Sequence, residues 1–494
     1  MNVIKINEKD NVAVALRDIS VGMVISENVK ALEYIPAGHK VSLENISSES
    51  AVIKYGYPIG YAVTDIIAGQ WVHTHNLKTG LYDKNEYKYQ PKASDYDKIL
   101  HSSDDKEFFM GFCRTDGSIG VRNEIWIIPT VGCVNNVAQT LADIAGKNVY
   151  GTVEKVKAFP HQYGCSQMGD DQENTRKILA DFIKHPNAGG VLVLGLGCEN
   201  SNIDVLKSYI GEYDSKRVKF LVCQDFEDEI AEGKKLLDEL ICYATSFDRQ
   251  QVSVSKLIVG LKCGGSDGFS GITANPIVGK FSDILITKGA TTILTEVPEM
   301  FGAETLLMER CENKNVFEQT VKLINDFKNY FTNHGQTIYE NPSPGNKKGG
   351  ISTLEDKSLG CTQKSGSSLV KGVLQYGQRV QSKGLNLLSA PGNDLVATTA
   401  LAASGAQIVL FTTGRGTPFA SPVPTIKISS NTDLANRKQS WIDFDAGCLI
   451  NGLDLEQLAG ELYNMVLKVA EGQYVKSEEA GYHDMAIFKQ GVTL

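Results

Sequence analysis

The sequence has no stretch of about eighteen consecutive apolar residues, although 42% of its 494 residues are hydrophobic. We therefore expect no membrane-spanning helix. The first residues, MNVIKINEKDNVAVALRDI, also lack the basic and then apolar order of a secretory signal peptide, which favours a cytoplasmic protein. Ten cysteines in such a chain are expected to be reduced thiols rather than disulfides.

Positively charged residues are fewer than negatively charged ones: the chain has 49 Lys and Arg residues and 58 Asp and Glu residues, which gives a net charge of -9. No basic stripe offsets this charge, so we do not expect a nucleic-acid partner. A small anionic ligand is not excluded, since local lysines and arginines decide its binding. The sequence does not decide whether the protein forms a homodimer, which is a possible partner arrangement.

A dinucleotide-binding fingerprint is also missing. The segment GLGCEN, residues 195–200, follows an apolar run but lacks the third glycine of that motif. We therefore expect no nicotinamide site. No internal repeat stands out, so the chain is not a solenoid of similar units.

What the sequence does contain is a change of pattern along its length. Residues 1–92 combine short β-type runs with frequent turn residues, which predicts a small all-β module. Residues 93–108 are polar and charged and are predicted to be a linker. In residues 109–250 and 251–494, Val/Ile/Leu runs alternate with helical stretches, which predicts two α/β domains with mainly parallel sheets.

Five segments of the chain end in a cysteine beside glycine, at Cys133, Cys165, Cys198, Cys263 and Cys361. We interpret each as a strand followed by a turn, with a weaker strand before the last. Ligands of open parallel sheets bind at the carboxyl ends of strands. Thiols there are soft metal ligands or easily ionised nucleophiles. The series indicates an active site assembled from several strand ends.

Acid and base candidates lie close to these cysteines. His161, four residues before Cys165, is a candidate general base, and a buried structural histidine is the alternative. Glu199 follows Cys198 directly. Glu296 and Glu299 follow another strand and suit a divalent cation or acid–base work, although Glu299 also suits a helix N-terminus. The candidate catalytic residues are therefore His161, Cys165, Glu199 and Glu296.

An acidic substrate would need local donors and cations. The segment CGGSDGFSG, residues 263–271, predicts a nest of backbone N–H groups. Residues 341–350 read as a long loop with two lysines, which is typical of a functional or a solvated loop. Arg415 lies between two glycines after a strand and suits a carboxylate. The candidate substrate-binding residues are Ser266, Asp267, Asn275, Lys347, Lys348 and Arg415.

Two histidines, His73 and His75, lie two apart on a presumed strand, where a period of two puts both on one face. Both could then bind one metal ion, with a solvated sheet edge as the alternative. Cys198 and Cys263 are added as strand-end donors, and such an N/S set suits iron(II) better than magnesium. His39 and Cys361 are left without an assigned role.

Long motifs connect the chain to a known family. They include IGVRNEIWIIPTVGC, HQYGCSQMGDD, CGGSDGFSGITANP, TEVPEMFGAE and NPSPGNKKGGISTLEDKSLGCTQKSG. From about residue 2 to 494 the sequence resembles the altronate/galactarate dehydratase family. The HTHN segment at residues 73–76 and Cys361 resemble its altronate branch. The resemblance implies a small N-terminal SAF-like β-clip domain followed by Rossmann-like α/β domains.

The same resemblance implies a metal-dependent dehydratase that uses iron(II) or manganese(II). The expected reaction removes water from D-altronate and gives 2-dehydro-3-deoxy-D-gluconate in hexuronate breakdown. Removing a proton next to a carboxylate creates negative charge that a metal or clustered cations stabilise. Alternatives are galactarate or another sugar acid as substrate, a non-catalytic sugar-acid binding protein, or an Fe–S enzyme that uses dispersed cysteines as cluster ligands.

Overall fold

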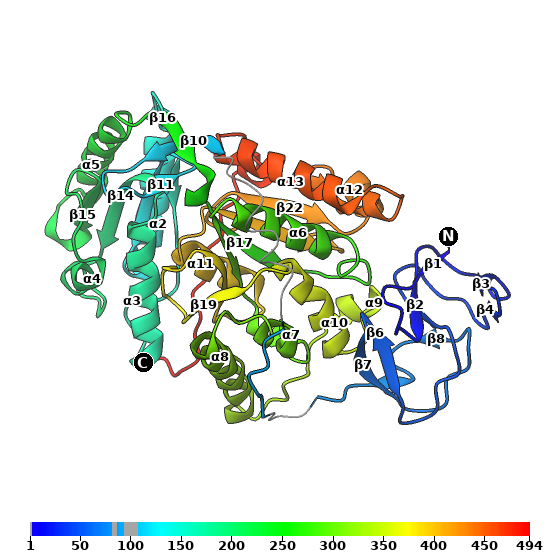
Figure 1. Ribbon diagram of the computed structural model, residues 1–494. Coiled ribbons are helices and arrows are strands. Elements are labelled where there is room, and N and C mark those ends of the chain that lie inside the picture. The colour runs from blue at the N-terminus through cyan, green and yellow to red at the C-terminus, as the bar shows by residue number, and fades with distance from the viewer. Residues whose placement is uncertain (1, 82–85, 93–106) are drawn as a thin grey trace.

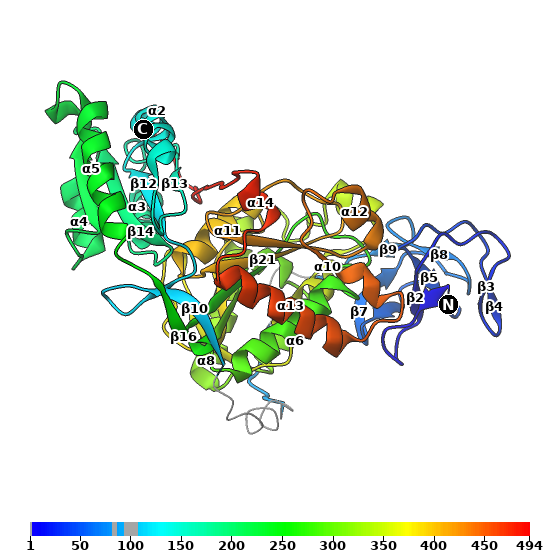
Figure 2. The same ribbon diagram turned by 90° about the horizontal axis from the view of Figure 1, so that it is seen from above.

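The computed structural model describes residues 2–81, 86–92 and 107–494. All but the last two residues of the predicted linker, 93–108, lie outside the described residues. Figure 1 shows a β module at one side, a large α/β domain in the middle and a smaller α/β domain at the other side. The view from above in Figure 2 shows the same succession.

The N-terminal module is built from short antiparallel strands, as predicted. One sheet has the order β1-β2-β5-β8, a second has the order β6-β7-β9, and β3 and β4 form a hairpin. Their bounds are Val3–Ile4, Val12–Ala15, Val24–Ser26, Val29–Lys30, Lys40–Ser42, Ala51–Lys54, Tyr57–Ala62, Trp71–Val72 and Leu77–Lys78 for β1 to β9. One hydrophobic cluster joins Val52 and Ile59 of the module to Ala303 and Leu359 of the large domain. The module therefore docks through a shared core.

The smaller α/β domain holds a four-stranded parallel sheet of order β13-β12-β14-β15. Its strands are β12 (Glu124–Pro129), β13 (Val156–Ala158), β14 (Ala188–Gly195) and β15 (Val218–Val222). Its helices are α2 (Asn135–Ala145), α3 (Gly169–Ile183), α4 (Ile203–Ile210) and α5 (Glu229–Ala244). Every residue of β14 is buried, as expected for a strand covered by helices on both faces.

A small antiparallel sheet of order β11-β10-β16 connects the two α/β domains. Its strands are β10 (Phe108–Cys113), β11 (Ile119–Gly120) and β16 (Arg249–Ser253). The boundary expected between residues 250 and 251 therefore falls within β16, a strand that pairs with β10 at the beginning of the smaller domain.

The large domain holds seven parallel strands in the order β19-β20-β18-β17-β21-β22-β23. Their bounds are β17 (Ile258–Cys263), β18 (Thr291–Leu294), β19 (Val370–Leu374), β20 (Gly384–Leu388), β21 (Ile408–Thr413), β22 (Thr425–Ser429) and β23 (Phe444–Asp445). Together with the parallel sheet of the smaller domain, this confirms the predicted α/β class. The sequence pattern missed β19 and β23, which lie toward the two edges of the sheet.

Helices cover both faces of the seven-stranded sheet. They are α6 (Ala274–Thr287), α7 (Glu304–Met308), α8 (Lys314–Asn333), α9 (Pro344–Lys348), α10 (Leu354–Cys361), α11 (Asp394–Ala403), α12 (Thr432–Arg437), α13 (Leu455–Ala470) and α14 (Lys476–Glu479). Helices α6 and α13 pack together, while α11 packs against α3 of the smaller domain. A single hydrophobic cluster includes Phe182 of α3 and Leu401 of α11, so the two domains share a core.

Two local predictions are wrong. The weak strand expected before Cys361 is helix α10, which begins after Thr353; the Thr353 side chain accepts a hydrogen bond from Asp356 N. The loop expected at 341–350 contains the short helix α9, which Ser343 caps in the same way through Asn346 N. Both helices begin with a side-chain N-cap, which satisfies free backbone N–H groups. In the described part of the chain, no helix has the length and apolar character needed to span a bilayer.

Candidate functional site

The carboxyl edge of the seven-stranded sheet gathers two thiols and a carboxylate. Cys263 is the last residue of β17, and Cys361 is the last residue of α10. Their Sγ atoms lie 3.4 Å apart, and both thiols contact Glu299 Oε2, at 3.3 Å from Cys263 and 3.1 Å from Cys361. All three residues are buried. Chemistry-bearing side chains from three segments therefore meet at one point.

Close approach of two glycines brings α10 to this edge. A Cβ atom on Gly271 would lie 2.7 Å from Gly360 Cα and would also collide with the Tyr55 hydroxyl. Gly360 directly precedes Cys361. Backbones that approach this closely leave no room for a side chain, so glycine is required at position 271.

Glu296 has an unusual backbone. It follows β18 with a φ of 71°, in the left-handed region that residues other than glycine rarely adopt. Its carboxylate forms an ion pair with Lys262 and accepts a hydrogen bond from Cys263 N at 3.0 Å. Non-glycine residues held in such a conformation cluster at functional sites. Glu296 is the one predicted catalytic residue at this edge.

Three buried lysines surround the carboxylates. Lys357 Nζ lies 2.8 Å from Glu299 Oε1. Lys364 Nζ lies 2.8 Å from Cys263 Sγ and 3.3 Å from Glu296 Oε2. Lys262 also contacts Asp394, at 3.0 Å. Three lysines thus face three carboxylates, namely Glu296, Glu299 and Asp394, and the cluster is formally neutral when both thiols are protonated.

The surroundings separate the pKa values of the two glutamates. Burial and the charge of Glu299 raise the pKa of Glu296, against the effect of Lys262 and Lys364. Burial would also raise the pKa of Glu299, but Lys357, Lys262 and Lys364 together hold it well below its ordinary value. Such a divided pair provides one carboxyl that exchanges a proton and one that stays ionised.

Burial and nearby charges also change the pKa values of Cys361 and Lys364. A hydrogen bond from the Cys263 thiol and burial raise the pKa of Cys361 well above that of a free thiol. Burial opposes the charge of Lys364, but Cys263 and Glu296 raise its pKa well above normal. Lys364 therefore stays protonated beside Cys263.

Within the described residues, Cys263, Glu299 and Cys361 are the one group of three ligating side chains whose donor atoms lie within 4.8 Å of one another. Two sulfur donors and one oxygen suit iron(II) better than a hard cation. A divalent ion that replaces two thiol protons leaves the net charge of the buried cluster unchanged. The donor set therefore fits a single soft or borderline divalent ion.

Two buried lysines of the β module form ion pairs with helix α10. Lys40 Nζ lies 2.8 Å from Asp356 Oδ2, and Lys54 Nζ lies 3.0 Å from Asp356 Oδ1. Burial would raise the pKa of Asp356, but these two lysines hold it well below its ordinary value. Asp356 precedes Lys357 on α10, so the module fixes the helix that carries Lys357 and Cys361.

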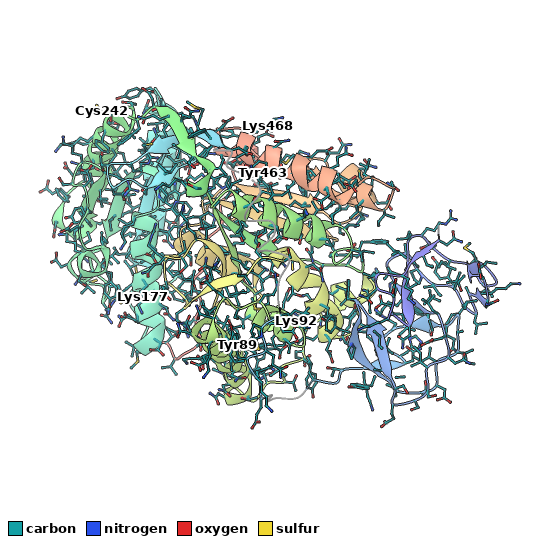
Figure 3. All side chains as sticks on the ribbon, viewed as in Figure 1. Tyr89, Lys92, Lys177, Cys242, Tyr463 and Lys468 are labelled. Atoms are coloured by element: carbon teal, nitrogen blue, oxygen red, sulfur yellow. The ribbon has the colours of Figure 1, made fainter. Side chains whose placement is uncertain are left out.

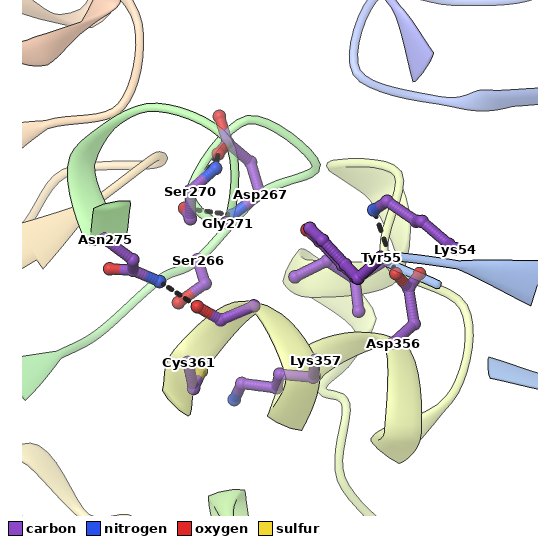
Figure 4. Close-up of a pocket in the computed structure, with 12 residues that line it drawn as sticks. Lys54, Tyr55, Ser266, Asp267, Ser270, Gly271, Asn275, Asp356, Lys357 and Cys361 are labelled. Carbon is purple, nitrogen blue, oxygen red and sulfur yellow. Dashed lines mark hydrogen bonds and ion pairs between the residues drawn. The ribbon is translucent and has the colours of Figure 1, made fainter. Parts of the chain in front are cut away.

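A narrow cavity lies between the module and the large domain, as Figure 4 shows. It has about 10 Å³ of water-accessible volume, which is room for about one water molecule. Its walls carry Lys54, Tyr55, Ser266, Asp267, Asn275, Asp356, Lys357 and Cys361. The cavity thus joins three predicted substrate-binding residues to the cluster around Glu299.

Asp267 and Asn275 already have protein partners. Asp267 is buried and accepts hydrogen bonds from Ser270 and Ser430, at 2.9 and 2.7 Å to its Oδ1. Asn275 donates to Gly360 O at 2.9 Å and accepts from Thr412 at 2.7 Å. These contacts give both residues a role in holding the turn after β17 and the end of α10.

The predicted cationic residues are more open. Arg415 is exposed, and its backbone N–H donates to Gly265 O at 2.9 Å, so it lies beside the turn after Cys263. Lys347 is half-buried and Lys348 is exposed, both on α9. Asn346 of the same helix donates to Ser266 O at 2.8 Å and ties α9 to that turn.

The structure does not place the HTHN residues on a strand. They form the turn between β8 and β9, where His73 is buried and His75 is exposed, so the prediction of a shared strand face is wrong. His73 stacks on Trp71 with ring centroids 5.3 Å apart and lies 5.0 Å from the His39 ring. Burial, Lys40 and His39 lower the pKa of His73 to about 3. Among the residues that the structure describes, its Nδ1 has no hydrogen-bond partner.

The remaining predicted catalytic and metal-binding residues lie on loops at the four-stranded sheet of the smaller domain. His161, Cys165, Cys198 and Glu199 follow strands of the four-stranded sheet, so the structure does not assemble the predicted metal set of His73, His75, Cys198 and Cys263. Both ring nitrogens of His161 are engaged, Nε2 with Pro129 O at 2.8 Å and Nδ1 with Tyr163 N at 3.1 Å. Burial lowers the pKa of His161 to about 4. These contacts favour the structural alternative for this histidine.

Sequence reasoning missed the lysines of the site. Lys357, Cys361 and Lys364 are spaced by four and three residues, and such residues are neighbours on one helical face. That spacing around Cys361 was the available signal. Lys262, directly before Cys263 on a buried strand, was a second signal, because lysine is almost never buried without a partner.

Comparisons with known proteins cover the whole chain. The family model of the altronate/galactarate dehydratase SAF domain matches residues 1–80. The second domain of D-galactarate dehydratase/altronate hydrolase matches residues 111–245, and the C-terminal domain of D-galactarate/altronate dehydratase matches residues 254–493.

Full-length relatives agree with these matches. Altronate dehydratase of Bacillus subtilis is 52% identical over 99% of both chains, and altronate dehydratase of Escherichia coli is 51% identical over 100% of both chains. Galactarate dehydratase (L-threo-forming) of Escherichia coli is 34% identical over 98% of this chain and 96% of its own. The resemblance read from the motifs is confirmed: the chain belongs to the altronate/galactarate dehydratase family.

Proposed function

We propose that this protein is a hydro-lyase that removes water from D-altronate and gives 2-dehydro-3-deoxy-D-gluconate, as a step of hexuronate catabolism. The observation that carries the proposal is the buried pair Glu296 and Glu299, with opposed pKa shifts, at the carboxyl edge of the seven-stranded sheet. The altronate dehydratases that match the full chain direct the choice of substrate.

Dehydration of a sugar acid needs two proton transfers. The C2 proton leaves to a base, the C3 hydroxyl leaves with a proton from an acid, and the resulting enol becomes the 2-keto acid. A carboxyl that gains and loses a proton serves one of these transfers. We assign this work to Glu296, whose pKa is raised by burial and by the charge of Glu299.

Charge stabilisation is the second requirement. Proton loss next to the substrate carboxylate creates a dianion, which is stabilised by cations aimed at the site in a water-poor environment. Lys262, Lys357 and Lys364 are buried and are paired with the carboxylates of the cluster. We propose that one or more of these lysines turn to the substrate when it binds.

The substrate carboxylate needs its own partner. Arg415 is exposed beside the turn that follows Cys263 and offers a planar guanidinium, which suits a carboxylate in a bidentate pair. Lys347 and Lys348 lie on α9, which Asn346 ties to the same turn. We propose that Arg415 binds the acid and that the two lysines approach it from α9.

We propose iron(II), with manganese(II) as the alternative, as the metal of this dehydratase. Cys263, Glu299 and Cys361 would hold it, since their donor atoms form a compact set of two sulfurs and one oxygen. A bound divalent ion would act as a Lewis acid toward substrate oxygen atoms. The two thiols favour iron over manganese, which prefers oxygen ligands.

Substrate entry requires movement. A six-carbon acid does not fit the cavity of about 10 Å³ between the module and the large domain. We infer that α9 or the β module separates from the turn after β17 to admit it. Closure over the substrate would then exclude water from the reaction.

The test is an anaerobic assay with iron(II) and a panel of aldonic and aldaric acids, with detection of 2-keto-3-deoxy products. D-Altronate is expected to be the preferred substrate, and galactarate a poor one. Preference for galactarate would mean that the protein is a hydro-lyase of the same family with galactarate, not D-altronate, as its substrate. Absence of any 2-keto-3-deoxy product with every acid, with iron or manganese, would overturn the hydro-lyase proposal.

A further inference from the structure

Three exposed thiols lie at the carboxyl edge of the four-stranded sheet, apart from the cluster around Glu299. Cys133 follows β12, Cys165 follows β13 and Cys198 follows β14. All three cysteines are free and exposed. Because β13, β12 and β14 are neighbouring parallel strands, each delivers one thiol to the same edge.

Hydrogen bonds hold the three cysteine loops together. Gly132 N donates to Tyr163 O at 2.9 Å and joins the Cys133 loop to the Cys165 loop. Asn200 Nδ2 donates to Cys165 O at 3.0 Å and joins the Cys165 loop to the Cys198 loop. The Cys165 loop thus lies between the other two and is bonded to both.

A glycine precedes each of these thiols, and each glycine is required by geometry. A Cβ on Gly132 would lie 2.8 Å from His161 O, and a Cβ on Gly164 would lie 2.8 Å from Val131 Cα. Gly197 has a φ of 131°, which residues with a side chain rarely adopt. The Cys133 and Cys165 loops therefore approach each other more closely than loops with side chains at positions 132 and 164 could, and Gly197 gives the Cys198 loop a backbone turn that other residues rarely adopt.

Two buried polar residues support the same loops. Glu199 accepts a hydrogen bond from the Thr130 hydroxyl at 2.5 Å, which links the Cys198 loop to the end of β12. His161 lies under the Cys165 loop, with one ring nitrogen on Pro129 O and the other on Tyr163 N. Glu199 and His161 are thus positioning residues for the thiols.

The thiols themselves are left available. In the described part of the chain, the one hydrogen bond to any of their Sγ atoms is a long contact of 3.9 Å from Gln224 Nε2 to Cys198. They do not form a group within 4.8 Å, as Cys263, Glu299 and Cys361 do. Ligands of one ion at Zn–S distances of about 2.3 Å lie within about 4 Å of each other. Three thiolates that do not share one ion can each bind a different iron of a polynuclear centre.

We propose that Cys133, Cys165 and Cys198 ligate an iron–sulfur cluster of the [4Fe–4S] type. Three thiolates bind three of its irons, and the fourth iron keeps a non-protein ligand such as water. Exposure of the thiols places that iron toward solvent, where a ligand oxygen can reach it. The proposal concerns a different sheet edge from the proposed dehydratase site and does not depend on it.

The test is anaerobic reconstitution of the full chain with ferric iron, sulfide and an excess of a thiol reductant that supplies the electrons for the ferrous ions of the cluster, followed by measurement of iron, acid-labile sulfide and visible absorbance. About four iron and four sulfide per chain are expected for one cluster. Cys133→Ser, Cys165→Ser and Cys198→Ser should each lose most of the sulfide and the brown colour. Cys263→Ser should keep them, which separates this proposal from the metal proposed at the other edge.

Cys242→Ser is the matched control, because Cys242 is also exposed but lies on α5 at the other end of the same domain (Figure 3). A second measurement needs no variant: anaerobic alkylation with peptide mapping should find the three thiols protected after reconstitution and Cys242 still reactive. Iron uptake without labile sulfide, or unchanged uptake in all three serine variants, would overturn the proposal.

Discussion

At the edge of the four-stranded sheet, Cys133, Cys165 and Cys198 face solvent, whereas at the edge of the seven-stranded sheet Cys263 and Cys361 are buried. The local sequence is similar, a glycine beside a cysteine after an apolar run. The difference in thiol exposure comes from the segments that cover each sheet edge. The β module and α10 cover the second edge and add buried lysines, while the cysteine loops of the first edge are held together mainly by each other.

This contrast teaches that a thiol's chemistry is decided by residues distant in sequence. Lys364 lies 2.8 Å from Cys263 Sγ although 101 residues separate them along the chain. No hydrogen bond to Cys133 or Cys165 Sγ occurs among the described residues. At one edge the thiols lie among buried charged side chains, and at the other they are exposed to solvent.

The largest expected effect is on turnover at the buried edge. Glu296→Gln keeps the shape of the side chain but removes the exchangeable proton, so it should lower kcat by about 10²–10⁴-fold. The measurement is the anaerobic altronate assay, with circular dichroism to verify the fold. Glu479→Gln, at an exposed glutamate, is the control. Full activity of Glu296→Gln would remove Glu296 from the proton transfers.

A large effect on stability is expected from Lys357→Met. Glu299 would lose its 2.8 Å ion pair and stay charged in the interior. Breaking a buried pair costs about 3–5 kcal/mol, which lowers the thermal midpoint of a domain of this size by about 6–20 °C. Lys322→Met, which breaks the exposed pair with Asp326, should shift it little. Equal shifts in both variants would show that Lys357 is not a structural counter-ion.

A smaller effect is expected for Arg415→Lys. The charge remains, but the bidentate fork is lost, so kcat/KM for altronate should fall by about one to two orders of magnitude with the fold intact. Arg415→Ala should lose more. Arg437→Lys, near the end of α12, is the control. Unchanged kinetics in both Arg415 variants would move carboxylate binding to another residue, with the turn at 263–271 as the next candidate.

The smallest expected effect is on the pH dependence of folding stability, and it comes from His73 in the β module, away from both sheet edges. Burial holds the pKa of His73 at about 3, against about 6.5 in the unfolded chain. Below pH 6.5 the unfolded state therefore binds a proton that the folded state does not, and stability falls as the pH drops. His73→Gln should reduce this loss between pH 6.5 and 5.5 by up to about 1 kcal/mol after solvent screening.

Thermal midpoints at the two pH values measure this difference, with the exposed His75→Gln as control. The pKa of His39 is also lowered by burial, so part of the pH dependence should survive in His73→Gln. A pH dependence identical to that of the unmodified protein would mean that His73 does not stay neutral in the folded state.

Much of the fold could be predicted from the sequence. Continuous Val/Ile/Leu runs such as VLVLG and QIVLFTT predict fully buried strands, and these are β14 and β21. Helix α10 was missed because all eight of its residues are buried, including the charged residues Glu355, Asp356 and Lys357. Its polar residues therefore do not mark a solvent-facing side, and its sequence lacks the amphipathic period of a surface helix. Its position follows from tertiary packing rather than from a local pattern.

The candidate site was predicted only in part. Cys263 and Glu296 follow strands, so their meeting at one edge was foreseeable. Lys357 and Lys364 were not, because a lysine is buried only when partners distant in sequence neutralise it. The pairing of His73 with His75 failed because the period of two applies to strands, and these residues form a turn.

The contact between Gly271 and Gly360 has a consequence for mutational scanning. Any side chain at Gly271 would push α10 away and separate Cys361 from Cys263. Substitutions there should abolish growth on the substrate as thoroughly as substitutions of Glu296, although glycine contributes no reacting group. A map of intolerant positions would therefore mix two kinds of residue at this edge, and purified protein would distinguish them: a Gly271 variant should be displaced in structure, a Glu296 variant only in rate.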